Sequence, residues 1–245
     1  MHPAFTRTDH RPWPLPTESW SWRQTWCDLL FAHWRVPAPV LRPHVPPGLT
    51  LQEFDGSAWL GVVPFRMEGV TLRNVPPVPF LSAFPELNVR TYVDRDGRPG
   101  VWFFSLDTTN PFAVRAARAL FHLPYFGASM RVAADGPGFR YRSRRDERPP
   151  AQLDMTYEPA GAVFEAEPGT LDHFLTERYC LYAASSGGLF ITEIHHVPWP
   201  LQPARAQIER NTMGSQVGLA LDTPPLTLHF ARRQEVVIWN PKRLT

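Results

Sequence analysis

The sequence predicts an α+β, mainly β fold in which short strands form a barrel-like architecture with a few short helices. Twenty-eight prolines are spread over the 245 residues, so long helices are disfavoured and the elements must be short. Strand-like segments recur along the whole chain, and helical signals are confined to two stretches. A chain of this length can bury a substantial core, so we expect residues 20–245 to form one domain behind an irregular N-terminal arm of residues 1–19.

The first third of this domain contains mostly strand signals. Residues 26–36 form a brief apolar run that fits a strand or a short helix, because periodicity does not separate the two at this length. Further strands are expected at 49–53, at 58–65 after a turn at Asp55 and Gly56, and at 82–93, which residues 94–100 connect to a following strand as a hairpin.

The clearest helix is predicted over residues 110–123. Asn110 is a candidate N-cap, Pro111 occupies a position where proline is tolerated, and Pro124 ends the run. A second short helix is expected at 169–178. The remaining strands are expected at 125–134, 138–145, 151–157, 189–197 after a hairpin turn at Gly187 and Gly188, 226–232 and 235–240.

The strand at 82–93 carries a row of polar side chains on one of its two faces. Alternation places Leu87, Val89, Thr91 and Val93 on one face, and Glu86, Asn88, Arg90 and Tyr92 on the other. The polar row either faces solvent on an edge strand or faces an interior chamber. Inside a chamber each charge needs a partner, water or a ligand, because an unpaired buried charge costs many kcal/mol.

Composition excludes several classes of partner and compartment. The formal net charge of +2 gives no large field, so we expect neither nucleic acid nor a membrane as a partner. The N-terminal residues lack the apolar core of a signal peptide, and no run is long enough to cross a bilayer, so a cytoplasmic protein is expected. Cys27 and Cys180 indicate ordinary thiols. The sequence makes no prediction of an oligomeric state.

Imine chemistry has almost no candidate residue. Of the 25 basic residues only Lys242 is a lysine, and arginine does not form imines. A Schiff base would therefore depend on Lys242 or on the α-amino group.

The histidine and arginine clusters are better explained by structural roles than by metal or nucleic-acid binding. Glu193 and His195 share one strand face while His196 points away, and no further ligands are near, so a packed histidine pair is favoured over a metal site. His122 at a helix end fits a capping role. Among five arginines between residues 139 and 150, three share one strand face, which favours a solvated surface over nucleic-acid binding. These three are Arg140, Arg142 and Arg144.

Several motifs carry a resemblance to a known family. The segments VLRPHVPPGLTL, FPELNVRTYV and RALFHLPYFGASM resemble the acetoacetate decarboxylase-like superfamily, and with TERYCLY and IHHVPWPLQPA they resemble its YqjF-like branch, domain-of-unknown-function family 2071. The resemblance spans roughly residues 20–240. It implies a β-barrel-like fold with a closed internal cavity.

The resemblance implies a cavity position for one residue, and it also shows that the catalytic lysines of the decarboxylases are replaced. It implies that Glu86 matches a glutamate inside the decarboxylase cavity. Tyr125 and Phe126 occupy the positions of two adjacent lysines, of which the first forms the imine and the second lowers its pKa. Cys27 falls near the position of a substrate-binding arginine. The signature reaction of the decarboxylases is therefore not expected here.

Three functional hypotheses follow, and none requires a cofactor or a metal. In the first, the protein binds a small apolar molecule with a carbonyl or carboxylate group. In the second it is an enzyme in which Glu86 moves a proton and Tyr125 or Arg90 stabilises an oxyanion, although Tyr125 also fits an aromatic wall residue. The third, a purely structural module, would not explain the polar row. The expected ligand-binding residues are Glu86, Asn88, Arg90, Tyr92, Tyr125 and Phe126.

Overall fold

The computed structural model of the chain describes residues 2–78 and 82–244. Positions 1, 79–81 and 245, which the predicted arm and domain include, lie outside the described residues. Strands dominate the described part and its helices are short, which confirms the mainly β prediction. Within this part no helix has the length and apolarity needed to cross a membrane.

One set of strands surrounds the interior of the molecule. Its members are β1 (Trp22–Val36), β3 (Ala58–Leu72), β4 (Phe84–Arg95), β5 (Arg98–Thr108), β10 (Cys180–Ser185), β11 (Gly188–His195) and β13 (Thr227–Ile238). They pair in the order β11, β10, β5, β4, β3, β1, β13, and β13 pairs again with β11. The order of neighbours therefore closes on itself, and only the contact between β10 and β5 is parallel.

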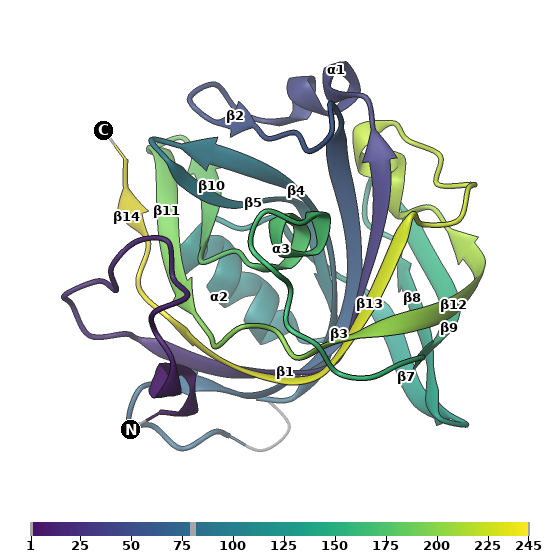
Figure 1. Cartoon of the computed structure of the whole chain (residues 1–245), viewed down its shortest axis with the longest axis horizontal. Coiled ribbons are helices and arrows are strands. Elements are labelled where there is room, and N and C mark those ends of the chain that lie inside the picture. Colours follow the sequence, from purple (N-terminus) through teal and green to yellow (C-terminus); the bar gives the residue numbers. More distant parts are fainter. Residues whose placement is uncertain (1, 79–81, 245) are drawn as a thin grey trace.

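A second antiparallel sheet extends from this set on one side (Figure 1). Its strands are β12 (Leu201–Asn211), β9 (Ala151–Pro159), β8 (Gly138–Arg145) and β7 (Ser129–Asp135). The start of β12 pairs with β13, which joins the two parts. Short strands complete the pairing: β2 (Thr50–Leu51) beside β4, β6 (Tyr125–Gly127) beside β5 and β14 (Lys242–Arg243) beside β11.

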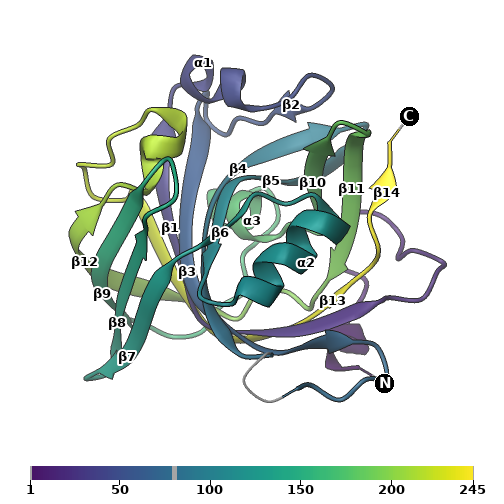
Figure 2. The ribbon, with the colours of Figure 1, turned by 180° about the vertical axis from the view of Figure 1, so that it is seen from behind.

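Two helices cover opposite ends of the closed strand order. Figure 1 shows α3 (Leu171–Thr176) in front of these strands, and Figure 2, from behind, shows α2 (Pro111–Phe121) in front of them. Asn110 begins α2 as predicted, because its side chain accepts hydrogen bonds from the backbone N–H groups of Phe112 and Ala113. The remaining short helices are α1 (Ala38–Leu41) and the 3-10 turns η1 (Pro3–Thr6), η2 (Arg42–His44) and η3 (Met213–Val217).

Several predicted boundaries needed correction. Residues 26–36 belong to a strand, and the strand predicted at 49–53 is reduced to Thr50–Leu51. The segment at 125–134 is divided between β6 and β7, and the segments at 226–232 and 235–240 form one continuous strand, β13. The predicted helix at 110–123 ends at Phe121, where His122 adopts a left-handed conformation.

Strand β12 was missed because its neighbourhood is rich in proline. Proline lacks the N–H that a strand donates, so the sequence analysis placed no strand in this segment. In the structure Pro203 lies near the start of β12 and its carbonyl oxygen accepts a hydrogen bond from the backbone N–H of Ala160. The proline therefore contributes an acceptor to the strand pairing although it has no N–H to donate.

The N-terminal arm packs against the end of the strand set. Ala4 is buried with Val237 and Trp239, and Arg11 is buried beside β11. Apart from η1, residues 2–19 form no helix or strand. Its contacts fix it against β11 and β13.

Candidate functional site

A pocket of about 300 Å³ lies inside the closed strand order, between α2 and the segment after α3. This volume is within the range of small-molecule sites. The lining is mostly apolar, and its aromatic members are Trp22, Trp26, Phe65, Phe84, Phe103, Phe112, Phe121, Tyr125 and Trp199. A few polar side chains interrupt it, chiefly those of Glu86, Asn88, Arg90 and Arg178.

Strand β4 supplies the central polar row of this pocket. Glu86, Asn88 and Arg90 are all buried and all contribute to the lining. The alternate residues Leu87 and Val89 are fully buried in an apolar core on the other face. Because β4 pairs with β3 on one side and with β5 on the other, it is not an edge strand, and the edge-strand alternative does not apply. Burial of both rows of side chains shows that neither face is solvated.

Tyr92, the fourth residue of the predicted row, lies outside the pocket lining. Its hydroxyl donates to the carbonyl oxygen of Leu175 at 2.8 Å and lies 2.6 Å from Nε2 of His33. The row therefore continues past the pocket and ends beneath α3. Tyr92 anchors this short helix to β4, so the expectation that it lines the chamber needed correction.

Glu86 and Tyr125 form a direct pair inside the pocket. The Tyr125 hydroxyl donates to Oε2 of Glu86 at 2.6 Å, and both residues line the pocket. Tyr125 reaches this position because β6 pairs in parallel with β5, and β5 is the neighbour of β4. A tyrosine that follows a helix-ending proline is thus brought to a glutamate 39 positions earlier.

Burial controls the ionisation of this pair. The Glu86 side chain is almost completely excluded from water, which raises its pKa to about 8; the Tyr125 hydrogen bond opposes the rise, and the charge of Asp107 adds to it. Burial and the neighbouring Glu86 raise the pKa of Tyr125 well above its ordinary value. At neutral pH the carboxyl of Glu86 is therefore mostly protonated, and Tyr125 remains a neutral phenol that donates a hydrogen bond.

Phe126 does not line the pocket, which corrects the expectation that it contacts a ligand there. Its ring lies under the guanidinium of Arg145, with 4.3 Å between the guanidinium carbon and the ring centroid. Arg145 and Asp107 are both fully buried and form an ion pair at 3.2 Å. Burial raises the pKa of Asp107 to about 7, while Arg145 opposes this shift.

Arg145 and Arg178 are polar residues that sequence reasoning missed. Period-2 alternation along β8 places Arg145 on the buried face with Tyr141 and Ser143, so the signal was present. Arg178 was placed in a helix that ends earlier, at Thr176, and no periodic signal marked it as inward-facing. Burial lowers the pKa of Arg178 to about 10, which leaves it positively charged at neutral pH.

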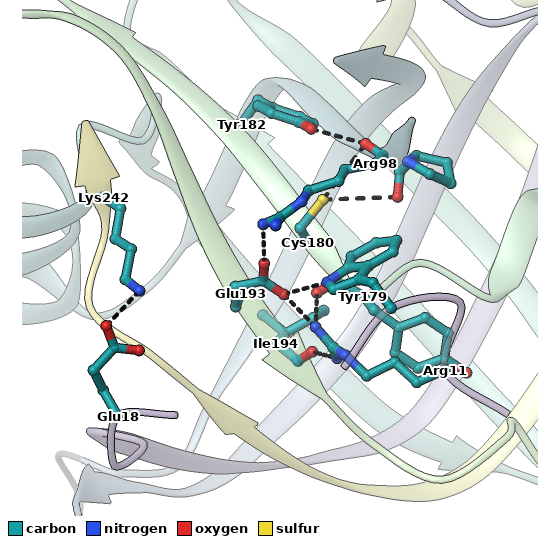
Figure 3. A network of polar contacts seen from close by, with 11 residues as sticks. Arg11, Glu18, Arg98, Tyr179, Cys180, Tyr182, Glu193, Ile194 and Lys242 are labelled. Atoms are coloured by element: carbon teal, nitrogen blue, oxygen red, sulfur yellow. Dashed lines mark hydrogen bonds and ion pairs between the residues drawn. The ribbon is translucent and has the colours of Figure 1, made fainter. Parts of the chain in front are cut away.

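Glu193 is held by the N-terminal arm, as Figure 3 shows. One carboxylate oxygen accepts from Arg11 and from Trp13 Nε1, and the other accepts from Arg98 Nη1 at 3.0 Å. His195 lies 3.2 Å from the Arg7 carbonyl through Nε2, and His196 lines the pocket. Among residues 2–78 and 82–244, no group of three or more His, Cys, Asp or Glu side chains is arranged to hold a metal ion.

Lys242 lies far from this chemistry, on the short strand β14. Its Nζ contacts Oε1 of Glu18 at 2.7 Å, and its side chain is 52% exposed (Figure 3). Cys27 is buried and does not line the pocket. Neither the lysine nor this cysteine contributes to the pocket wall.

The arginines of β8 that share the solvent-facing side have acidic partners. Arg140 contacts Asp154 and Glu209, and Arg142 contacts the same Asp154. Arg144 contacts Asp146. Their charges are therefore locally balanced by neighbouring carboxylates.

Comparisons with known proteins agree on the family and the fold. Residues 23–235 match the family model DUF2071, described as "Uncharacterized conserved protein". The chain is 44% identical over 225 residues to the "Uncharacterized protein YqjF" of Bacillus subtilis (strain 168), covering 92% of this chain and 93% of that protein.

Solved structures of low sequence identity share the fold. The acetoacetate decarboxylase of Legionella pneumophila has a TM-score of 0.63 at 12% identity, covering 96% of this chain and 93% of its own. The enduracididine biosynthesis enzyme MppR, complexed with pyruvate, has a TM-score of 0.64 at 13% identity, covering 97% and 94%. An acetoacetate decarboxylase-like enzyme from Sphingomonas wittichii RW1 has a TM-score of 0.60 at 14% identity, covering 96% and 97%.

The raised pKa of Glu86 predicts a pH-dependent stability. In the unfolded chain a glutamate loses its proton near pH 4.5, whereas folded Glu86 keeps it to about pH 8. Between these values the unfolded state binds fewer protons, so wild-type stability falls as pH rises. Glu86→Gln has no proton to lose. Its free energy of unfolding relative to wild type should therefore increase from about pH 4.5 to 8 and then level off.

Urea unfolding of both proteins at pH 5, 7 and 8.5 measures this difference. Glu53→Gln, which removes a carboxyl at an exposed position, serves as the matched control. Asp107 titrates in an overlapping range, but it is present in every variant. A difference between Glu86→Gln and wild type that stays constant with pH would contradict the assignment.

Proposed function

Because the chain belongs to the DUF2071 family and has the fold of acetoacetate decarboxylase-like proteins, we propose that it binds a small apolar molecule bearing a carbonyl or carboxylate group. The binding site is the internal cavity of a barrel formed by the closed strand order, and binding proceeds without a Schiff base. This proposal is supported by one observation above all: a neutral Glu86 and Tyr125 pair faces a mostly apolar pocket that is rich in aromatic side chains.

The aromatic lining selects an apolar body for the ligand. Burial of apolar surface contributes about 25 cal/mol per Å², so a ligand of this kind gains affinity by leaving water. The few polar groups then determine its orientation, because a ligand oxygen that pairs with Glu86 or Asn88 restores a hydrogen bond lost on entry. The two features together favour a molecule with one oxygen-containing group and a hydrocarbon remainder.

A second candidate function is acid–base catalysis at the same residues. A carboxyl with a pKa of about 8 can give or accept a proton near neutral pH, which an ordinary glutamate does poorly. The phenol of Tyr125 or the guanidinium of Arg90 would stabilise an oxyanion that develops on a carbonyl. The two functions differ in one readout: an enzyme exchanges the hydrogens beside the ligand carbonyl with deuterium in D2O in a Glu86-dependent way, whereas a binding protein does not.

Occupation of the pocket is tested with the neutral ketone 4-phenylbutan-2-one. Trp22, Trp26 and Trp199 line the pocket, so saturable quenching of tryptophan fluorescence should report binding. Ala117→Phe fills the pocket from the α2 wall and should reduce affinity at least tenfold. Ala119→Phe, on the same helix but exposed and outside the lining, should bind as wild type does. Equal affinity in both variants, or no saturable binding to wild type, would contradict the proposal.

The absence of imine chemistry is a separate prediction. After incubation with acetoacetate or pyruvate and sodium cyanoborohydride, the intact mass of the protein should show no stoichiometric adduct. The reason is that Tyr125 and Phe126 cannot form imines and Lys242 is exposed on β14. Lys242→Arg controls for surface labelling. A stoichiometric adduct that persists in this variant on an internal residue would refute the prediction.

A further inference from the structure

Four arginine side chains are buried in the part of the chain that the structure describes. Two of them form an ion pair with a buried carboxylate, since Arg145 pairs with Asp107 and Arg11 with Glu193. The other two, Arg90 and Arg178, form no ion pair with an acidic side chain among residues 2–78 and 82–244. Both line the pocket, so two positive charges face one enclosed space.

The hydrogen-bond partners of these two guanidiniums are neutral. Arg90 donates to the carbonyl oxygen of Leu175 at 3.2 Å, and Arg178 donates to the carbonyl oxygen of Phe174 at 2.7 Å and to Oε1 of Gln52 at 2.5 Å. Carbonyl oxygens fix the direction of the side chains but do not cancel their charge. Removing each ion from water costs several kcal/mol, which an anion in the pocket would offset.

Unpaired polar atoms of the pocket indicate, independently of charge, that a ligand or water contacts this part of the wall. Nε of Arg90 and Oδ1 of Asn88 are buried without a hydrogen-bond partner among the described residues. Both residues line the pocket beside Arg178. A buried polar atom without a partner is unfavourable, so the Nε donor of Arg90 fits an oxygen of an anion, and the Oδ1 acceptor of Asn88 fits water or another donor.

We propose that Arg90 and Arg178 form the carboxylate subsite of the pocket, and that the ligand is an apolar monocarboxylic acid. This inference rests on the proposed function and names its ligand class. Guanidinium groups match the planar carboxylate through paired N–H donors. The aromatic lining receives the hydrocarbon part of the acid, and the protonated carboxyl of Glu86 adds no repulsion toward its charge.

Three probes of the same shape test the charge preference of the wild-type protein. We expect 4-phenylbutanoate to bind at least tenfold more tightly than 4-phenylbutanamide in calorimetry at pH 7, a difference of about 1.4 kcal/mol. The cation 4-phenylbutylammonium should bind more weakly than the amide. Equal affinity for the acid and the amide would overturn the carboxylate subsite and leave the apolar pocket standing. Failure of all three probes would contradict the proposed function and this inference together.

Substitutions test whether Arg90 and Arg178 cause the preference for the carboxylate. Arg90→Gln and Arg178→Gln should each lower the affinity for 4-phenylbutanoate at least tenfold and change the affinity for the amide less than threefold. Arg178→Lys, which keeps the charge, should retain part of the preference. Arg131→Gln, at an exposed position of β7 outside this pocket, should change neither affinity. If circular dichroism shows that the glutamine variants do not fold, the comparison of acid and amide binding to the wild-type protein tests the carboxylate subsite.

Discussion

The hydrogen bond from the Tyr125 hydroxyl to Glu86 joins the two segments on which the pocket depends. Glu86 is buried on β4, which pairs with β3 and β5, and Tyr125 lies on β6 after helix α2. A carboxylate in this position would lose its hydration, and a single phenol donor compensates for only part of that loss. The carboxyl therefore keeps its proton, and the strand retains a polar group in an aromatic environment.

Buried charge is distributed unevenly around this neutral pair. Asp107 and Arg145 form an ion pair beside Phe126, and the N-terminal arm brings Arg11 to Glu193. No acidic side chain among the described residues plays this role for Arg90 or Arg178. The pocket thus has a protonated acid among its polar groups and uncompensated positive charge elsewhere in its wall, which is an arrangement suited to an apolar molecule with an anionic end.

The sequence predicted the features that depend on short-range pattern. Asn110 and Pro111 marked the start of α2, and alternation along residues 82–93 placed Glu86, Asn88 and Arg90 on one face. Features that depend on contacts between residues far apart in the sequence could not be predicted from short-range pattern. Proline concealed the strand signal of β12. Tyr92 lies outside the pocket because its hydroxyl contacts α3. The pairing of Arg145 with Asp107 needed β5 and β8 to be placed together, which no local pattern specifies.

The ionisation of Glu86 tests the account most directly. Glutamate labelled with 13C at the side-chain carboxyl gives one NMR signal that is present in wild type and absent from Glu86→Gln, and its chemical shift can be followed from pH 4 to pH 10. The account predicts a midpoint near pH 8, well above the ordinary value of about 4.5. A midpoint close to 4.5 would show that Glu86 is ionised at neutral pH, and the neutral hydrogen-bonded pair would then have to be abandoned.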